Sequence, residues 1–221
     1  MKLRSVKQAR AIWLVNYFDL NPYGTSLFPT IPKIAQKYMF QAVPTKPDEL
    51  ELGKGVNLRG GTFKNDNRAI AVDLTIYGDG LVADTRSSTD DSDVFLNEFL
   101  AWMSMEFGLA SYQEFLKSKL YLSELWVQTD KVLNSLNHKL DDFAKRLTAS
   151  IVGRGHQHLE FETSGISFWT DPTIMVNPPG PFRFEREENA PFGEHRYYSA
   201  APLQTDVHLE LLTELESILS N

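Results

Sequence analysis

Residues 68–86, RAIAVDLTIYGDGLVADTR, carry the clearest strand pattern in the chain. Large aliphatic residues occupy every second position from 70 to 76, and small or polar residues stand between them. This alternation is typical of a β-strand with one buried face. The turn Gly78-Asp79-Gly80 accepts positive φ angles, so a second strand is expected to return over residues 81–86. The stretch therefore predicts an antiparallel hairpin.

Similar patterns on both sides of the hairpin predict the rest of the fold. Further strands are expected at residues 11–20, 56–64, 120–128, 158–162, 166–169, 182–187 and 195–200. Four main helices are expected near residues 30–40, 91–107, 131–151 and 205–219. Ser88-Thr89-Asp90-Asp91 caps the second helix and Gly108 ends it. Gly60-Gly61, inside a strand, indicates a bulge or a close backbone approach. The predicted class is α+β, with a mainly antiparallel sheet or sheets and four main helices.

The two halves of the chain share an order of elements. Residues 11–107 and 120–219 both read strand, helix, several strands and a capped helix, and their last helices open on Thr89-Asp90 and Thr205-Asp206. A duplicated unit and a chance recurrence of common alternation both explain this order. We expect a single α+β domain over residues 1–221, with both halves on one core, because true interdomain linkers are exposed and polar. The linker at 108–119 instead carries apolar residues at helical spacing.

Composition and charge narrow the class of protein. The 221 residues are 42% hydrophobic, carry a formal net charge of −7 and include no cysteine. Disulfides, a thiolate nucleophile and cysteine-based zinc sites are therefore excluded. The acidic balance argues against a dedicated nucleic-acid binder. No run approaches the ~20 apolar residues of a membrane span, and the apolar run at 11–15 is too short for a signal peptide. We expect a soluble cytoplasmic protein with neither a nucleic-acid nor a membrane partner.

One short segment has the residue types of a metal site. If the chain is extended from His156 onward, then His156, His158, Glu160 and Glu162 point to one face. His195 could supply a third nitrogen to a divalent metal. The competing interpretation is the solvated face of a half-buried strand. No cofactor is predicted beyond this candidate metal.

Two glycine-rich stretches could approach a phosphate. Gly153-Arg154-Gly155 follows a helix C-terminus, where orphan carbonyl groups repel anions, so a helix cap explains it better. The basic stretch from Gly53 to Lys64, which includes Arg59 and Gly60, lacks the known phosphate-loop spacings and is interpreted as an edge hairpin. Asp84, near Arg86 at the end of a strand, is expected to form a salt bridge or to lie at a solvated edge.

A group of aromatic and basic residues is a further candidate for contact with a ligand or a partner. Phe192, Arg196, Tyr197 and Tyr198 lie near a turn, where they could contact a ligand or a partner. The sequence favours a non-enzymatic binding or assembly protein, with self-association or a protein partner and a homo-oligomeric state. The alternatives are a metal-assisted hydrolase built on His156, His158 and His195, and a small-ligand binder with a pocket between the halves.

Overall fold

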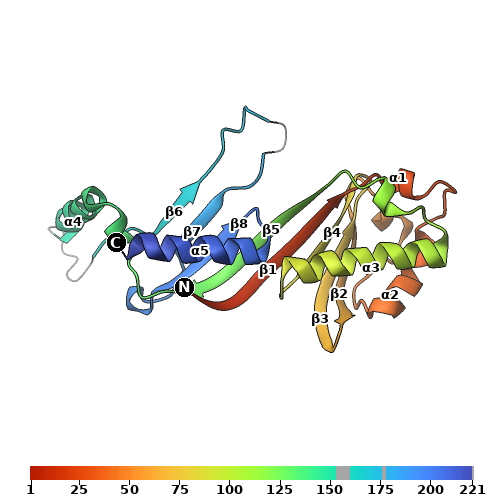
Figure 1. Cartoon of the computed structure of the whole chain (residues 1–221), viewed down its shortest axis with the longest axis horizontal. Helices are drawn as coiled ribbons and strands as arrows, with labels where there is room; N and C mark the ends of the chain where they lie inside the picture. Colours follow the sequence, from red (N-terminus) through yellow and green to blue (C-terminus); the bar gives the residue numbers. More distant parts are fainter. Residues whose placement is uncertain (153–159, 176–177, 221) are drawn as a thin grey trace. The chain divides into compact units, whose positions relative to one another are not determined.

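The computed structural model describes residues 1–152, 160–175 and 178–220 (Figure 1). Its strands are β1 (Lys2–Leu14), β2 (Val56–Asn65), β3 (Arg68–Ile76), β4 (Gly80–Thr85), β5 (Ser118–Gln128), β6 (Gly165–Phe168), β7 (Phe182–Arg186) and β8 (Arg196–Ala201). Its α-helices are α1 (Tyr17–Leu20), α2 (Ile31–Tyr38), α3 (Thr89–Phe107), α4 (His138–Val152) and α5 (Thr205–Leu219). The strands form an eight-stranded sheet in the order β2-β3-β4-β1-β5-β8-β7-β6. The α+β class with a mainly antiparallel sheet and four longer helices is therefore confirmed.

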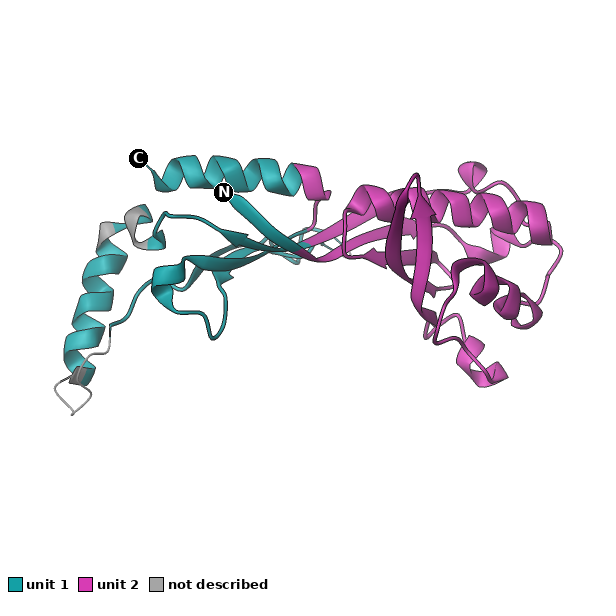
Figure 2. Cartoon of the chain, turned by 90° about the horizontal axis from the view of Figure 1, so that it is seen from below, with its two compact units in different colours: residues 1–5, 124–201, 207–221 teal, residues 6–123, 202–206 magenta. Residues whose placement is uncertain are grey.

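The chain divides into two compact units, which Figure 2 colours separately. Unit 1 comprises Met1–Ser5, Glu124–Ala201 and Val207–Asn221, and unit 2 comprises Val6–Ser123 and Pro202–Asp206. The predicted linker at 108–119 belongs to unit 2, where Leu109 is buried and Tyr112 and Phe115 pack against the core. Packing of this segment agrees with its apolar spacing. Whether the whole chain unfolds as a single domain stays a prediction.

Unit 2 contains a sheet with two different faces. The alternating residues of β3 that the sequence singled out, such as Leu74, are buried with Trp13 of β1 against Phe95 and Phe99 of α3. This face is the core. On the opposite face β1, β3 and β4 present half-buried and exposed side chains. The period of two along each strand therefore places the polar side chains together on the face away from α3.

The predicted bulge in β2 has a clear cause. The β2–β3 register shifts between Leu58 and Gly61, and Gly60 adopts a φ of +68°. A Cβ atom on Gly61 would lie 2.5 Å from a ring carbon of Phe40. Glycine is therefore required twice here, once for the left-handed backbone and once for the approach of an aromatic ring.

Helix α3 begins and ends as its sequence predicts. The Ser88 side chain accepts a hydrogen bond from the Asp91 amide, and Gly108 closes the helix in a left-handed conformation. Thr89 and Thr205, the first residues of α3 and α5, also cap each other. The Thr89 amide donates to Thr205 Oγ1 at 3.1 Å, and the Thr205 amide donates to Thr89 Oγ1 at 2.9 Å.

Unit 1 has a smaller core of its own. Phe184 of β7 and Tyr197 of β8 stack with ring centroids 4.6 Å apart, and both side chains are fully buried. His208 of α5 is also fully buried, with its Nε2 atom 2.8 Å from Ser199 Oγ. Burial raises the cost of a charge on the imidazole and lowers the pKa of His208 to about 4.

Three sequence-based boundaries need correction. The strand expected at 11–20 begins at Lys2 and ends at Leu14, because the Asn16 side chain caps the short helix α1. The helix expected at 131–151 is α4 preceded by a separate 3₁₀ turn, Leu133–Leu136. Residues 160–162, the described part of the strand expected at 158–162, are not a strand, and the edge of the sheet is β6.

The order of the strands bears on the duplication. If β1 to β4 correspond to β5 to β8, the observed order reads the same from both ends. Helices α3 and α5 then occupy equivalent places in the two halves. Their first residues, Thr89 and Thr205, also cap each other in the same way. This order supports a duplicated unit, which stays a prediction.

Candidate anion-binding site

Strand β4 is shorter than its neighbours, and this creates a notch in the sheet of unit 2. Pairing with β3 ends at Val72↔Thr85, and pairing with β1 ends at Ala9↔Thr85. Strand β3 nevertheless begins at Arg68, and β1 precedes Ala9 with further residues. Beyond Thr85 the two outer strands therefore continue without a strand between them.

The notch is a depression of about 570 Å³. Its lining residues all belong to unit 2 and come from four strands and the residue that follows β4. They are Lys7, Gln8, Arg10, Arg59, Gly60, Ala71, Val72, Asp73, Asp84, Thr85 and Arg86. This volume lies within the range of roughly 300–1,000 Å³ that is usual for small-molecule sites.

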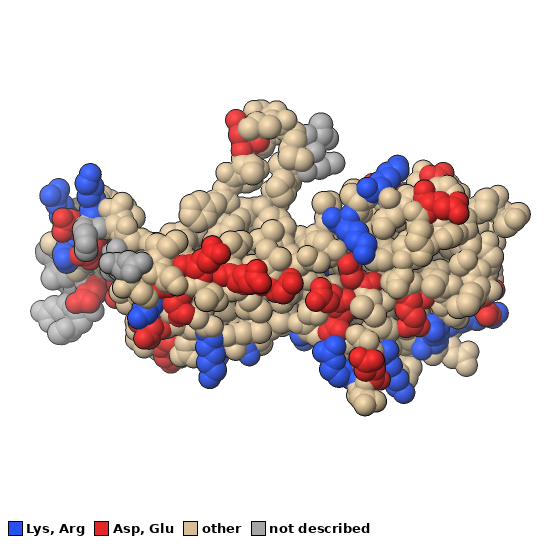
Figure 3. Space-filling model, in the orientation of Figure 1, with Lys and Arg blue, Asp and Glu red and all other residues tan. Residues whose placement is uncertain are grey.

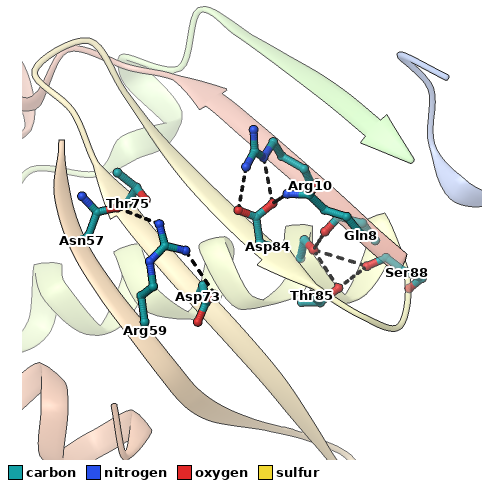
Figure 4. A network of polar contacts seen from close by, with 11 residues as sticks. Gln8, Arg10, Asn57, Arg59, Asp73, Thr75, Asp84, Thr85 and Ser88 are labelled. Atoms are coloured by element: carbon teal, nitrogen blue, oxygen red, sulfur yellow. Dashed lines mark hydrogen bonds and ion pairs between the residues drawn. The ribbon is translucent and has the colours of Figure 1, made fainter. Parts of the chain in front are cut away.

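Asp84 fixes the first arginine of the notch (Figure 4). Arg10 donates from Nε and Nη2 to the two carboxylate oxygens of Asp84, at 2.8 and 2.9 Å. Gln8 donates to the same carboxylate at 2.8 Å. The paired donors of a guanidinium match a carboxylate in one plane, so the contact sets the orientation of the Arg10 side chain. The ion pair expected of Asp84 exists, but its partner is Arg10 and not Arg86.

Asp73 fixes the second arginine from the neighbouring strand. Arg59 Nη1 lies 3.3 Å from Asp73 Oδ2, and Arg59 Nη2 donates to the side-chain oxygen of Asn57 at 3.2 Å. The other oxygen of Asp73 accepts the Gly60 amide at 2.7 Å. The bulge in β2 thus supplies a backbone donor that holds Asp73 in place. The Arg59 side chain remains 57% exposed, so its guanidinium stays accessible.

Arg86 is the third arginine, and it differs from the other two. It is exposed, and among the residues that the structure describes it has no hydrogen-bond or ion-pair partner. Its position directly after Thr85 puts it where β4 leaves the sheet. A guanidinium carries five N–H donors and no acceptor, so an unpaired one favours an anionic ligand.

The charge of the notch is opposite to that of the chain. Its lining has four basic residues and two carboxylates, whereas the whole chain carries −7. Figure 3 shows basic and acidic side chains interspersed on the side of unit 2 where α3 lies. The basic excess is therefore a local feature that the overall composition conceals. A depression with an excess of one sign of charge concentrates ligands of the opposite sign.

The predicted metal site cannot be assembled from the described residues. His156 and His158 lie outside them, Glu160 is exposed, and His195 is half-buried. No group of three or more histidine, aspartate and glutamate side chains suited to a metal occurs within residues 1–152, 160–175 and 178–220. The metal hypothesis stays a prediction.

The predicted aromatic and basic group is split between two sides of β8. Tyr197 lies in the core, whereas Tyr198 faces the opposite side, with its ring 5.3 Å from that of Trp126. Phe192 is 44% exposed and packs against the Arg186 guanidinium at 4.2 Å. Arg196 pairs with Glu187 at 2.7 Å, and this hydrogen bond lowers the pKa of the Glu187 carboxyl. Contact of this group with a ligand or partner stays a prediction.

Sequence reasoning found part of the notch. It singled out Arg59, Gly60, Asp84 and Arg86, but it treated the first two as an edge hairpin and missed Arg10. The signal that could have revealed Arg10 is the alternation of side chains between the two faces of a strand. Arg10, Asp73 and Asp84 all alternate with buried residues on their strands, so they share the face away from α3.

Comparison with known proteins gives no family for this chain. No family model matches it, and no curated protein gives a significant match. A solved chain described as Methanococcus jannaschii TBP aligns with a TM-score of 0.44 and 11% identity, over 99% of this chain and 97% of the other. A likeness this weak carries no functional argument. Among the described residues no helix has the length and apolar character needed to cross a membrane.

Proposed function

We propose that this chain is a non-enzymatic binding protein that holds an anionic ligand in the notch of unit 2. The observation that carries the proposal is the unpaired guanidinium of Arg86 beside two arginines that carboxylates already hold in place. Arginines fixed before binding lose little side-chain entropy when a ligand arrives. Phosphate and carboxylate groups both fit the donors of a guanidinium.

A binding role suits the lining better than a hydrolytic one. The described residues around the notch include no histidine, serine, cysteine, tyrosine or glutamate. The Thr85 hydroxyl points elsewhere, since it donates to the Ser88 carbonyl at 3.0 Å. Asp73 and Asp84 already accept hydrogen bonds from arginines and, for Asp73, from the Gly60 amide, so both carboxylates hold the arginines in place. The notch thus offers donors and charge without a paired nucleophile and base.

Calorimetric titration with inorganic phosphate at low ionic strength tests the proposal. The wild-type chain should bind phosphate, and Arg86→Gln should weaken binding by about tenfold or more, as expected for the loss of a charge-assisted hydrogen bond. Arg183→Gln is the matched control, because Arg183 is an exposed arginine of β7 in unit 1. Absence of phosphate binding, or equal binding by the Arg86 and Arg183 variants, would contradict the proposal.

Self-association is a second candidate function, favoured by the segment that joins β6 and β7. In Figure 1 the described residues of this segment, 169–175 and 178–181, extend away from β6 and β7. Its side chains include Trp169, 71% exposed, Ile174, 78% exposed, and Met175, 52% exposed. Exposed apolar patches of this kind often mark protein interfaces. Sedimentation equilibrium should then give an oligomer that Trp169→Ser shifts toward monomer, and a wild-type monomer at all concentrations would reject this candidate.

A further inference from the structure

A second depression adjoins the notch and shares Arg86 with it. It has a volume of about 440 Å³ and is lined by Arg68, Ala69, Ile70, Ala71, Arg86 and Ser87. Ala71 and Arg86 line both depressions. Residues 69–71 lie on the part of β3 that extends past the end of β4. The two depressions therefore adjoin at Arg86, where β4 has ended.

The second depression has its own fixed arginine. Arg68 donates from Nη2 to Asp91 Oδ1 at 2.9 Å, and Asn65 donates to the same oxygen at 3.1 Å. The Asp91 side chain is only 4% exposed, whereas that of Arg68 is 63% exposed. The ion pair with this buried carboxylate of α3 thus fixes the Arg68 side chain, most of which stays exposed to solvent. The pattern repeats that of Arg10 and Arg59 in the notch.

We infer that the ligand carries two or more linked phosphate groups, one in the notch and the next in the second depression, with Arg86 between them. This inference rests on the proposed function of the notch. Five donors in a planar fork allow one guanidinium to contact two neighbouring phosphates. Arg10 and Arg59 face the first phosphate, and Arg68 faces the second.

The carboxylates beside the arginines explain why a single phosphate group should bind less tightly than two linked ones. Asp73, Asp84 and Asp91 orient the arginines, but they also offset part of the positive charge. A single phosphate gains contacts on one side of Arg86 only. Two linked phosphates gain contacts in both depressions but lose translational freedom only once. Their affinity should therefore be much higher than that of a single phosphate.

The lining also indicates which part of the ligand is recognised. Neither depression is lined by a phenylalanine, tyrosine or tryptophan. Nucleobases are usually held by stacking on aromatic rings. The described site therefore recognises the phosphate chain itself, whether it is a free oligophosphate or part of a nucleoside triphosphate.

Calorimetric titrations of the full chain with phosphate, pyrophosphate, tripolyphosphate and ATP, without metal and at constant ionic strength, test this inference. Pyrophosphate should bind about tenfold or more tightly than phosphate, as expected for added charge-assisted hydrogen bonds. Tripolyphosphate and ATP should bind alike. Removing Arg68 alone would leave the buried Asp91 carboxylate without its ion-pair partner, so the test uses the double variant Arg68→Gln/Asp91→Asn. It should keep the wild-type affinity for phosphate and lose the gain for pyrophosphate.

The outcomes separate this inference from the proposed function. If phosphate binds through Arg86 and pyrophosphate binds no more tightly, the inference fails and the proposed function stands. If neither phosphate nor pyrophosphate binds, both fail. An affinity for ATP about tenfold above that for tripolyphosphate would show recognition of the nucleoside and overturn the inference. Loss of phosphate binding in the double variant, with its circular dichroism unchanged, would contradict the division into two depressions.

Discussion

The buried imidazole of His208 should make the stability of the chain depend on pH. In the fold this side chain is fully buried, beside Ser199 and 6.0 Å from the ring of Phe182. Burial lowers its pKa to about 4, whereas an unfolded histidine has a pKa of about 6.5. Between these values the unfolded chain binds a proton that the folded chain does not. Stability should therefore be full above about pH 6.5 and fall as the pH decreases toward 4.

The size of the effect follows from the two pKa values. One pKa unit corresponds to about 1.4 kcal/mol, so lowering the pH from 7 to 4.5 should cost about 2.5 kcal/mol through this residue. The assay is urea denaturation at both pH values, followed by far-UV circular dichroism, on wild type and His208→Gln. The variant should lose this part of the pH dependence, because glutamine does not titrate.

A control separates His208 from the other titrating groups. His195→Gln, which removes a half-buried histidine of the same unit, is the matched control for the loss of an imidazole. If His208→Gln and wild type lose the same free energy between pH 7 and 4.5, the imidazole is not held neutral by burial, and the reasoning is refuted.

Two further changes test the packing of unit 2 by urea denaturation. Gly61→Ala should destabilise the fold by about 1–3 kcal/mol, because its Cβ atom would lie 2.5 Å from the ring of Phe40. Gly53→Ala is the control, because a Cβ atom at position 53 would meet no atom within 4 Å. Equal losses of stability in the two variants would contradict the close approach of Phe40 to Gly61. Thr89→Val should cost about 1–3 kcal/mol, because it leaves the Thr205 amide buried without its acceptor. A double-mutant cycle of Thr89→Val with Thr205→Val should show coupling, and simple additivity would argue against the exchanged caps.

The sequence predicted those features that short-range patterns determine. The alternation in β3, the Ser88 cap and the bulge at Gly60-Gly61 all depend on residues close in the chain, and all three are found. The end of β1 was misplaced because Asn16 offers its side chain to the backbone of α1, a local competition that an apolar run conceals.

The notch depends on contacts that no local pattern contains. Arg10 and Asp84 are 74 residues apart, and they meet only because β1 and β4 pair in one particular register. The length of β4 relative to its neighbours is likewise a property of the assembled sheet. The sequence did place Asp84 near Arg86, but period-two geometry alone could not reveal that Arg10 takes the carboxylate and leaves Arg86 unpaired. Trp169, the last residue of the strand expected at 166–169, lies just past the end of β6 and is 71% exposed.

The proposed function requires an anion to bind at Arg86, where β1 and β3 continue past the end of β4. The most direct measurement is an anomalous difference map from crystals of the full chain soaked in selenate, a tetrahedral oxyanion that scatters anomalously. A selenium peak is expected in the notch, within hydrogen-bond range of the Arg86 guanidinium, and no such peak is expected in crystals of Arg86→Gln. Selenate peaks confined to other surfaces, or a peak in the notch that persists in the variant, would contradict it.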